Sequence, residues 1–318
     1  MAEAVGAGGA LSPILVTGMP RSGTTWVGRM LDATPETGWI SEPFNLDRAP
    51  TVFRAPVPHW FMYVTSDNDA AYVGPMLEAL RFDSHYLDDL KAVRSKRDFV
   101  QVVRRWRVQQ ECRGHRKRPL VKEPHAVFSA EWLARRFGFA VVITVRHPVA
   151  VVSSWKRLNW PFDFGHLLSQ PLLVRDWLEP FRREIEAAAR DPDDLIGHVA
   201  LLWRLVYGVV AHYQERFPEF HVVRQEDLSL DPVGRFAELY SAIALPFTDE
   251  ARRAIEGASS ATNPREVSAA DPYGVRLDSR ANLENWKRRL SETEVARIRS
   301  IAGDIAALYY PEEPWLRT

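Results

Sequence analysis

Residues 13–32, PILVTGMPRSGTTWVGRMLD, combine the chemistry of a β-strand with that of an α-helix around a glycine-containing loop. Ile14–Val16 form a short apolar run, and Val27, Met30 and Leu31 fall on one face at helical spacing. A loop that leads into a helix N-terminus presents unpaired backbone N–H groups and the positive end of the helix dipole. Phosphate or sulfate is the natural ligand of such a loop. The stretch therefore predicts a strand, an anion-binding loop and a helix.

The spacing of Gly18 and Gly23 resembles the nucleoside-triphosphatase loop GxxxxGK[ST], but Thr24 stands where that loop needs its lysine. The cation is Arg21, inside the loop. In the triphosphatases the lysine reaches the β and γ phosphates and the hydroxyl beside it holds magnesium. This loop therefore implies no bound metal ion, and a kinase is the weaker of the enzyme alternatives.

The run PRSGTTW at residues 20–26 resembles the 5′-phosphosulfate loop of the sulfotransferases that use 3′-phosphoadenosine 5′-phosphosulfate (PAPS), whose pattern is close to PKSGTTW or PRSGTT. The resemblance implies that Arg21 contacts the sulfonate and the bridging oxygen. It further implies that Trp26 stacks on adenine and that the 5′-phosphate is held by the residues between them, Ser22, Gly23, Thr24 and Thr25. Arginine at the basic position is more similar to the tyrosylprotein and carbohydrate branches than to the small-phenol branch.

Strand and helix patterns alternate along the rest of the chain, which predicts an α/β fold with a central parallel sheet and helices on both faces. The resemblance implies the P-loop NTPase-like sulfotransferase version of that fold. No repeat or low-complexity linker divides the chain, so we expect a flexible N-terminus over residues 1–12 and a single domain over 13–318. The remaining expected strands are Trp39-Ile40, Leu120–Lys122, Ala140–Val145 and His221–Val223.

Three segments break the alternation. Residues 44–68 and 161–180 are rich in proline and aromatic side chains, and we interpret them as ordered loops on the substrate side. Ser259–Asp278 is polar, and we expect a flexible lid there. Helices are expected over Ala71–Phe82, Asp98–Gln110, Val127–Phe137, Val149–Leu158, Pro180–Arg190, Leu195–Phe217, residues 232–244, and from Ser291 onward with a capping box.

A second anion site is expected where the Ala140–Val145 strand runs into RHP at residues 146–148. Open α/β sheets bind ligands at the carboxyl ends of their strands, which puts Arg146 at the same edge as the first loop. Arg146 and Ser154 match the family's motif for the 3′-phosphate, which one cation and one hydroxyl can hold by charge-assisted hydrogen bonds. Near the C-terminus, Arg280 and Lys287 resemble the family's loop over the 3′-phosphate and adenine, although that loop's two glycines are missing here.

Sulfonyl transfer needs a base for the acceptor proton. Glu42 is the first candidate: it follows a predicted strand, and the tyrosylprotein branch places its glutamate at the same interval of twenty-one residues from the loop's basic residue. His125 is the second, because the small-phenol branch uses a histidine just after the third strand, although here it stands one residue out of register. His59, in the aromatic loop, is the third.

Composition limits the partners and the location. Forty-one basic residues balance forty-one acidic ones, so no overall field favours nucleic acid. The one cysteine, Cys112, can form no internal disulfide, and neither a signal peptide nor a run long enough to span a bilayer is present, which predicts a cytoplasmic protein.

The sequence as a whole predicts a PAPS-dependent sulfotransferase that releases adenosine 3′,5′-bisphosphate and needs no metal. Its acceptor would be a small molecule or a glycan: a carbohydrate, a glycolipid or an aromatic natural product. The alternative from another class is a non-catalytic nucleotide-binding module.

Overall fold

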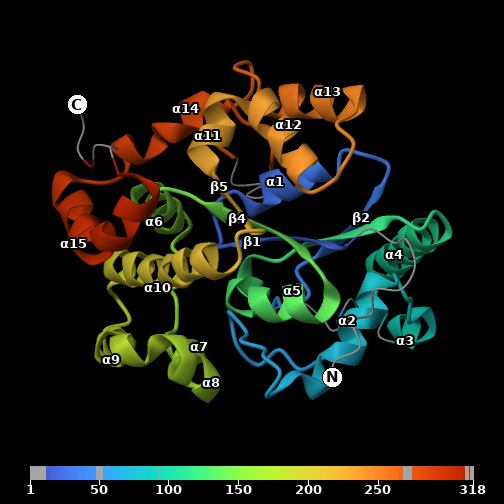
Figure 1. The fold of residues 1–318 in the computed structure, drawn as a ribbon, viewed down its shortest axis with the longest axis horizontal. Coiled ribbons are helices and arrows are strands. Elements are labelled where there is room, and N and C mark those ends of the chain that lie inside the picture. Colours follow the sequence, from blue (N-terminus) through green and yellow to red (C-terminus); the bar gives the residue numbers. More distant parts are fainter. Residues whose placement is uncertain (1–11, 48–52, 92, 268–273, 312–314, 316–318) are drawn as a thin grey trace.

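The computed structural model describes residues 12–47, 53–91, 93–267, 274–311 and 315. It contains a five-stranded sheet in which every strand is parallel to its neighbours, in the order β2-β3-β1-β4-β5 (Figure 1). The predicted fold class, a central parallel sheet flanked by helices, is confirmed. The strands are β1 (Ile14–Gly18), β2 (Thr37–Ser41), β3 (Arg118–Lys122), β4 (Ala140–Val145) and β5 (His221–Arg224).

The central strand β1 pairs with β3 on one side and with β4 on the other, Ile14 lying opposite both Leu120 and Ala140. The strands β2 and β3 therefore lie on one side of β1, and the later strands β4 and β5 lie on the other side. Ligands of open parallel sheets bind at such a switch point, beyond the carboxyl ends of the strands. The loops that follow β1, β3 and β4 meet at that edge.

Both faces of the sheet are buried, as the unbroken apolar runs predict. Ile14 and Val16 belong to an apolar cluster with α1, α12 and α13, whereas Leu15 and Ile143 belong to the larger cluster under α5, α6, α10 and α15. Figure 1 shows α12 and α13 above the sheet and α5 and α10 below it, with α6 and α15 toward the left. Two well-packed layers therefore hold the edge with the anion-binding loop in place.

The α-helices are α1 (Thr24–Leu31), α2 (Val73–Leu80), α3 (Tyr86–Lys91), α4 (Lys96–Gly114), α5 (Ala130–Phe137), α6 (Pro148–Leu158), α7 (Gly165–Leu168), α8 (Pro171–Leu173), α9 (Arg182–Arg190), α10 (Leu195–Arg216), α11 (Gln225–Leu230), α12 (Pro232–Ala242), α13 (Asp249–Ser259), α14 (Ser279–Leu283) and α15 (Glu292–Tyr309). Shorter helical turns are η1 (Asp69–Ala71), η2 (Pro124–Ser129), η3 (Val174–Leu178), η4 (Glu179–Phe181) and η5 (Asn285–Arg288). The capping box that Ser291 and Glu294 were expected to form at the start of α15 is present.

Two expectations concern residues only partly described. Of the expected flexible N-terminus, residues 1–11 lie outside the described residues. Within the expected lid at 259–278, residues 268–273 also lie outside them, while Glu266 and Val275 on either side line a pocket next to the anion-binding loop.

Helix α10 is the one described helix long and apolar enough to cross a bilayer. It is also the central helix of the larger apolar cluster, in which Trp203, Val206 and Tyr207 are fully buried. Burial of that kind is typical of a core helix in a globular domain.

Candidate active site

The loop after β1 has the backbone conformation of an anion-binding nest. Gly18 (φ 142°), Arg21 (φ 74°) and Gly23 (φ 103°) all have positive φ. A Cβ at Gly18 would lie 2.5 Å from the carbonyl oxygen of Thr144, so only glycine fits there. Gly23 caps α1 without a side-chain hydrogen bond to the first turn. The backbone N–H groups of that turn are thus available to a ligand.

Ser22 fixes the loop rather than facing a ligand. Its side chain is fully buried, and its hydroxyl lies 2.6 Å from the carbonyl oxygen of Met19 and 2.6 Å from the hydroxyl of Thr144. The expected contribution of Ser22 to a phosphate site can therefore come from its backbone, while Thr24 and Thr25 line the pockets on either side of the loop.

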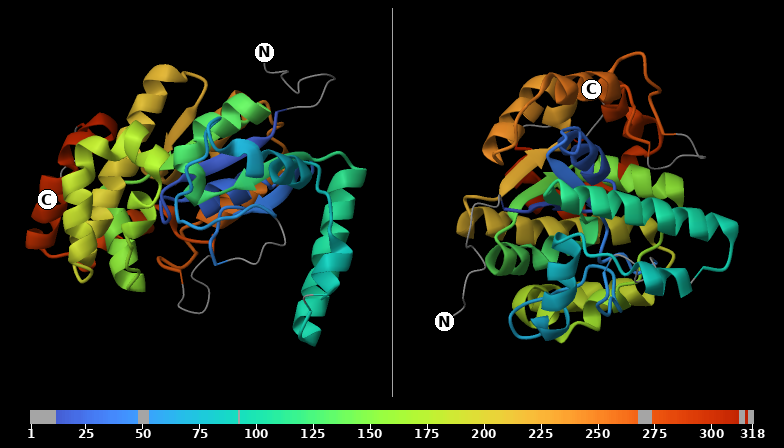
Figure 2. Two further views of the ribbon diagram at one scale, coloured as in Figure 1. Left: turned by 90° about the horizontal axis from the view of Figure 1, so that it is seen from below. Right: turned by 90° about the vertical axis from the view of Figure 1, so that its right-hand side faces the viewer.

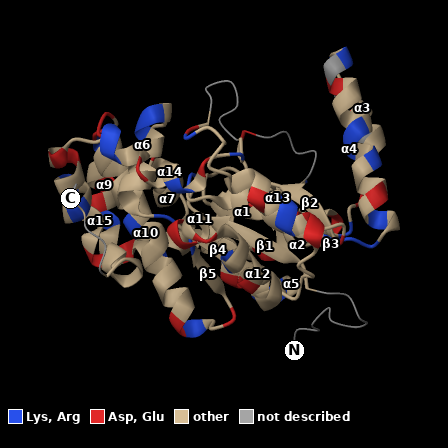
Figure 3. Ribbon diagram, turned by 90° about the horizontal axis from the view of Figure 1, so that it is seen from above, with Lys and Arg blue, Asp and Glu red and all other residues tan. Residues whose placement is uncertain are grey.

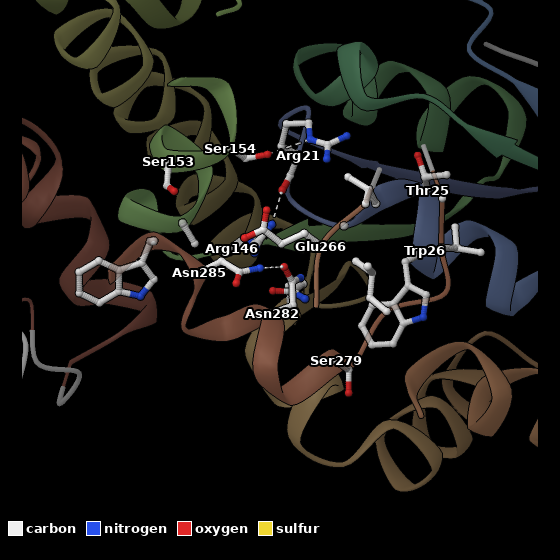
Figure 4. A pocket seen from close by; sticks show the side chains of 18 of the residues that line it. Arg21, Thr25, Trp26, Arg146, Ser153, Ser154, Glu266, Ser279, Asn282 and Asn285 are labelled. Atoms are coloured by element: carbon white, nitrogen blue, oxygen red, sulfur yellow. Dashed lines mark hydrogen bonds between the residues drawn. The ribbon is translucent and has the colours of Figure 1, made fainter. Parts of the chain in front are cut away.

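Arg21, Arg146 and Ser154 are brought together, as the sequence predicts. Arg21 Nε donates to Ser154 Oγ at 3.0 Å, and Arg146 Nη1 donates to the carbonyl oxygen of Arg21 at 3.3 Å (Figure 4). Arg146 Nε is buried without a hydrogen-bond partner. Burial lowers the pKa of the Arg146 guanidinium, and the nearby Glu226 opposes that effect. A buried cation with an unpaired donor is a binding group for an anion.

These residues line one wall of a pocket, which we call the cationic pocket. It also receives residues that the sequence analysis missed: Arg157 and Ser153 from α6, and Arg289 after η5. Arg157 stands one helical turn after Ser154, a spacing that could have identified it. Arg289 lies in the basic run at residues 287–289, of which the family resemblance implies only Lys287.

Glu266 lies among these cations. Its carboxylate contacts Arg288 Nη2 and Arg289 Nη2, each at 2.7 Å, and lies 4.0 Å from Arg157 Nη1. Arg289 Nη1 also donates to Ser153 Oγ at 3.4 Å. The Glu266 carboxylate therefore neutralises part of the positive charge of the cationic pocket.

The structure does not bring Arg280 or Lys287 into this pocket. Ser279, at the start of α14, turns inward and bonds the carbonyl oxygen of Ser229, so the next residue points outward. Arg280 is exposed and donates to the carbonyl oxygen of Leu230. Lys287 pairs with Glu284 at 2.6 Å.

Trp26 and Gln225 close the cationic pocket on the side of α1. The Trp26 ring meets Phe236 edge to face at 5.4 Å, and its Nε1 has no hydrogen-bond partner. Gln225 donates to Ser229 Oγ and leaves its own side-chain oxygen unpaired.

A second pocket, the aromatic pocket, lies on the other side of the loop and has a volume of about 540 Å³. Arg21, Thr24 and Thr25 line both pockets, so the two meet at the loop. Six aromatic side chains line it, Trp60, Phe61, Trp155, Trp160, Phe162 and Phe164, alongside charged groups such as Glu42, Asp47 and Lys122. Such a pocket can hold an uncharged organic molecule against the loop.

Glu42 lines the aromatic pocket and forms a close ion pair with Lys122 at the end of β3. The second carboxylate oxygen of Glu42 accepts a hydrogen bond from Asn45 Nδ2 at 2.6 Å, and its backbone is left-handed, with φ 52°. The sequence analysis missed Lys122 because it reads as an ordinary strand residue. Residues held in strained conformations often lie at active sites.

His125 lines the same pocket and is held by a buried carboxylate. Glu123, which is fully buried, accepts hydrogen bonds from the backbone N–H of His125 at 3.0 Å and of Phe44 at 2.6 Å. Nδ1 of His125 lies 3.1 Å from the same carboxylate. A proton on Nδ1 leaves Nε2 as a hydrogen-bond acceptor.

Two other histidines differ in their positions. His59 does not line the aromatic pocket; burial, followed by the charge of the neighbouring His166, lowers its pKa. His198, which the sequence analysis missed, lines that pocket, is 3% exposed and has no partner for either ring nitrogen. His198 is therefore a buried polar group in the wall of the aromatic pocket. Among the described residues, no group of three His, Cys, Asp or Glu side chains is placed to hold a metal ion.

The parallel sheet, the anion-binding loop and the two adjoining pockets are typical of an α/β protein that binds an anionic ligand beside an organic one. Comparison with known proteins identifies its family. The model of the sulfotransferase family matches residues 13–249, so the chain belongs to that family and is an enzyme of the transferase class. No protein with curated annotation has a significantly similar sequence.

Solved structures with this fold include the sulfotransferase domain of the olefin synthase of Synechococcus PCC 7002, with a TM-score of 0.51 at 15% identity. That match covers 97% of this chain and 98% of the other. Sulfotransferase STF9 from Mycobacterium avium matches with a TM-score of 0.45 at 17% identity, over 96% of this chain and 78% of the other. At these identities the first match supports the fold alone.

Proposed function

We propose that this sulfotransferase transfers a sulfonyl group from PAPS to a hydroxyl group and releases adenosine 3′,5′-bisphosphate. The observation that carries the proposal is that the loop after β1 and the Arg146–Ser154 pair line the same pocket and are joined by the Arg21 hydrogen bond. PAPS differs from ATP in carrying a phosphate on its ribose as well as the 5′-phosphosulfate, and it therefore needs two anion sites.

In this proposal the loop and the first turn of α1 hold the 5′-phosphate through backbone N–H groups and the hydroxyls of Thr24 and Thr25. Arg146 and Ser154 hold the 3′-phosphate. The additional positive charge comes from Arg157 and Arg289, because both line the cationic pocket. Arg280 and Lys287 do not line it. Trp26 offers a ring for adenine.

The transferred sulfonyl group would lie at the junction of the two pockets, since Arg21 lines both. Arg21 and Lys122 would stabilise the negative charge that develops on the sulfonate and on the leaving phosphate oxygen. An acceptor in the aromatic pocket would present its hydroxyl to the sulfur from the opposite side, in line with the leaving oxygen.

We propose that His125 is the base that takes the proton of the acceptor hydroxyl. Glu42 is the competing candidate. Glu123 holds Nδ1 of His125, so Nε2 can take a proton from a hydroxyl in the aromatic pocket. Both carboxylate oxygens of Glu42 already accept hydrogen bonds, from Lys122 and Asn45. Glu42 would then be a positioning residue that fixes Lys122 beside the leaving group.

For the acceptor, we propose a small organic alcohol or phenol, or the exposed end of a glycan or glycolipid. The aromatic walls favour a flat or apolar surface, and a sugar face or an aromatic natural product satisfies that condition. The proposed location is the cytoplasm, since a single thiol, Cys112, offers no disulfide framework.

Nucleotide selectivity tests this proposal against its alternatives. Adenosine 3′,5′-bisphosphate should raise the melting temperature more than adenosine 5′-phosphate or ATP with magnesium does. A ligand present at a hundred times its dissociation constant raises the free energy of unfolding by about 2.7 kcal/mol. Stronger stabilisation by ATP with magnesium would contradict the proposal and favour a kinase. Binding of the bisphosphate with no transfer to any acceptor would indicate a non-catalytic module.

A further inference from the structure

The helical hairpin formed by α3 and α4, residues 86–114, extends away from the body of the molecule (Figures 2 and 3). Seven large hydrophobic side chains are exposed among the described residues, and five of them belong to this hairpin. These five are Leu87 (73% exposed), Phe99 (48%), Val100 (62%), Trp106 (38%) and Val108 (45%). The helix that the sequence predicts over Asp98–Gln110 is confirmed, but much of its apolar surface faces solvent.

The same hairpin carries a local excess of positive charge. Residues 86–114 contain eight lysines or arginines and four acidic residues, although the whole chain is balanced. Arg105 is neutralised by Asp89 at 3.5 Å. Three exposed cations of α4 form no ion pair with any acidic side chain in the described part of the chain: Lys96, Arg104 and Arg107.

Exposed arginines of α4 share one surface with Val100 and Val108, while Phe99 lies at its flank and Trp106 packs against Tyr86 of α3 with ring centroids 5.3 Å apart. At 100° per residue, Arg107 falls beside Val100 and Arg104 falls between Val100 and Val108. The opposite side of the helix holds Val102, which is buried. Aromatic and aliphatic groups interleaved with arginines are the composition of helices that lie at the surface of a lipid bilayer.

We propose that the α3–α4 hairpin docks on an anionic lipid bilayer. The arginines and lysines would bind lipid phosphates, while Val100, Val108 and the flanking Phe99 would enter the headgroup region. A second copy of this chain fits less well, because it would bring a second set of unpaired cations against the first. This docking is independent of the proposed reaction, since no residue of the hairpin lines either pocket.

Vesicle co-sedimentation tests the proposal on the full chain. The protein should sediment with equimolar phosphatidylglycerol and phosphatidylcholine vesicles at low salt, and not with pure phosphatidylcholine. The charge-reversing double variant Arg104→Glu/Arg107→Glu should lower the partition coefficient by about tenfold or more, and Phe99→Ser/Val100→Ser should lower it as well. The matched control, Arg183→Glu/Arg190→Glu, changes two exposed arginines of α9 by the same charge and should leave it within about twofold.

High salt should weaken the binding of the unchanged protein, which tests the electrostatic part without any variant. Failure to sediment with the anionic vesicles at low salt would overturn the proposal, and so would an equal loss in the α9 control. A concentration-dependent dimer that Phe99→Ser/Val100→Ser abolishes, without vesicle binding, would show that the hairpin joins two copies instead.

Discussion

Replacing Arg146 by glutamine should weaken the binding of one phosphate selectively. In the structure the Arg146 guanidinium has a buried, unpaired Nε and a long hydrogen bond of 3.3 Å to the Arg21 carbonyl. A hydrogen bond to a charged group contributes about 1.5–3 kcal/mol. The variant should therefore bind adenosine 3′,5′-bisphosphate about 10- to 150-fold more weakly. Adenosine 5′-phosphate, which lacks the 3′-phosphate, should lose much less.

Titration calorimetry with both nucleotides measures the difference directly. The loss of the Arg146 bond to the loop affects the two ligands alike, so the ratio of the two losses isolates the contact with the 3′-phosphate. Arg280→Gln is the matched control: that side chain bonds Leu230 outside the pocket, and both affinities should stay unchanged. Equal losses for the two nucleotides in Arg146→Gln would refute the assignment and leave Arg146 as a support of the loop.

Three further perturbations test other parts of the site and the fold. Glu266→Gln should tighten binding of the bisphosphate by about three- to tenfold, since a like charge leaves the cationic pocket; weaker binding would mean that Glu266 orients the arginines. His125→Asn should lower turnover by about a hundredfold or more with bisphosphate binding retained, whereas Glu42→Gln should lower it less; the reverse order would make Glu42 the base. Burial raises the pKa of Asp32 to about 6, although the hydrogen bond from Thr37 acts to lower it. The native state therefore binds this proton more tightly than the unfolded state does, and the free energy of unfolding falls as the pH rises from about 4 to 6. Asp32→Asn should therefore raise the free energy of unfolding by about 1–3 kcal/mol at pH 7 and by little at pH 4, as denaturant titrations at the two pH values would measure.

The strands and the anion-binding loop were predictable because their signals are local. Ala140–Val145 is an unbroken run of apolar and β-branched residues, and the structure forms β4 over that same range. The loop between Gly18 and Gly23 is marked by glycines that its backbone requires. The meeting of Arg146 with this loop followed from the rule that parallel strands end at one edge.

The parts of the site that escaped prediction depend on contacts between distant segments. Glu266 and Arg289 reach the cationic pocket only because the chain after α13 folds back over α6, and no local pattern signals that path. Lys122 looks like a strand residue until Glu42 is placed against it. The helix α13 was missed although Thr248 caps it, because its apolar positions are few.

Periodicity also does not reveal what covers a helix. Val102 and Trp106 in α4 follow a helical apolar pattern, yet one is buried and the other 38% exposed. Whether such a face packs on the body or projects from it depends on the rest of the fold. The exposed apolar and cationic surface of the α3–α4 hairpin is therefore visible only in the structure.

Transfer of a labelled sulfonyl group from PAPS tests the central claim most directly. The enzyme, incubated with labelled PAPS and an extract of candidate acceptors, should produce a labelled product together with adenosine 3′,5′-bisphosphate. Arg21→Ala should abolish the label transfer, because Arg21 lines both pockets at their junction. Tight binding of the bisphosphate without a labelled product from any acceptor, or equal label transfer by Arg21→Ala, would contradict the account.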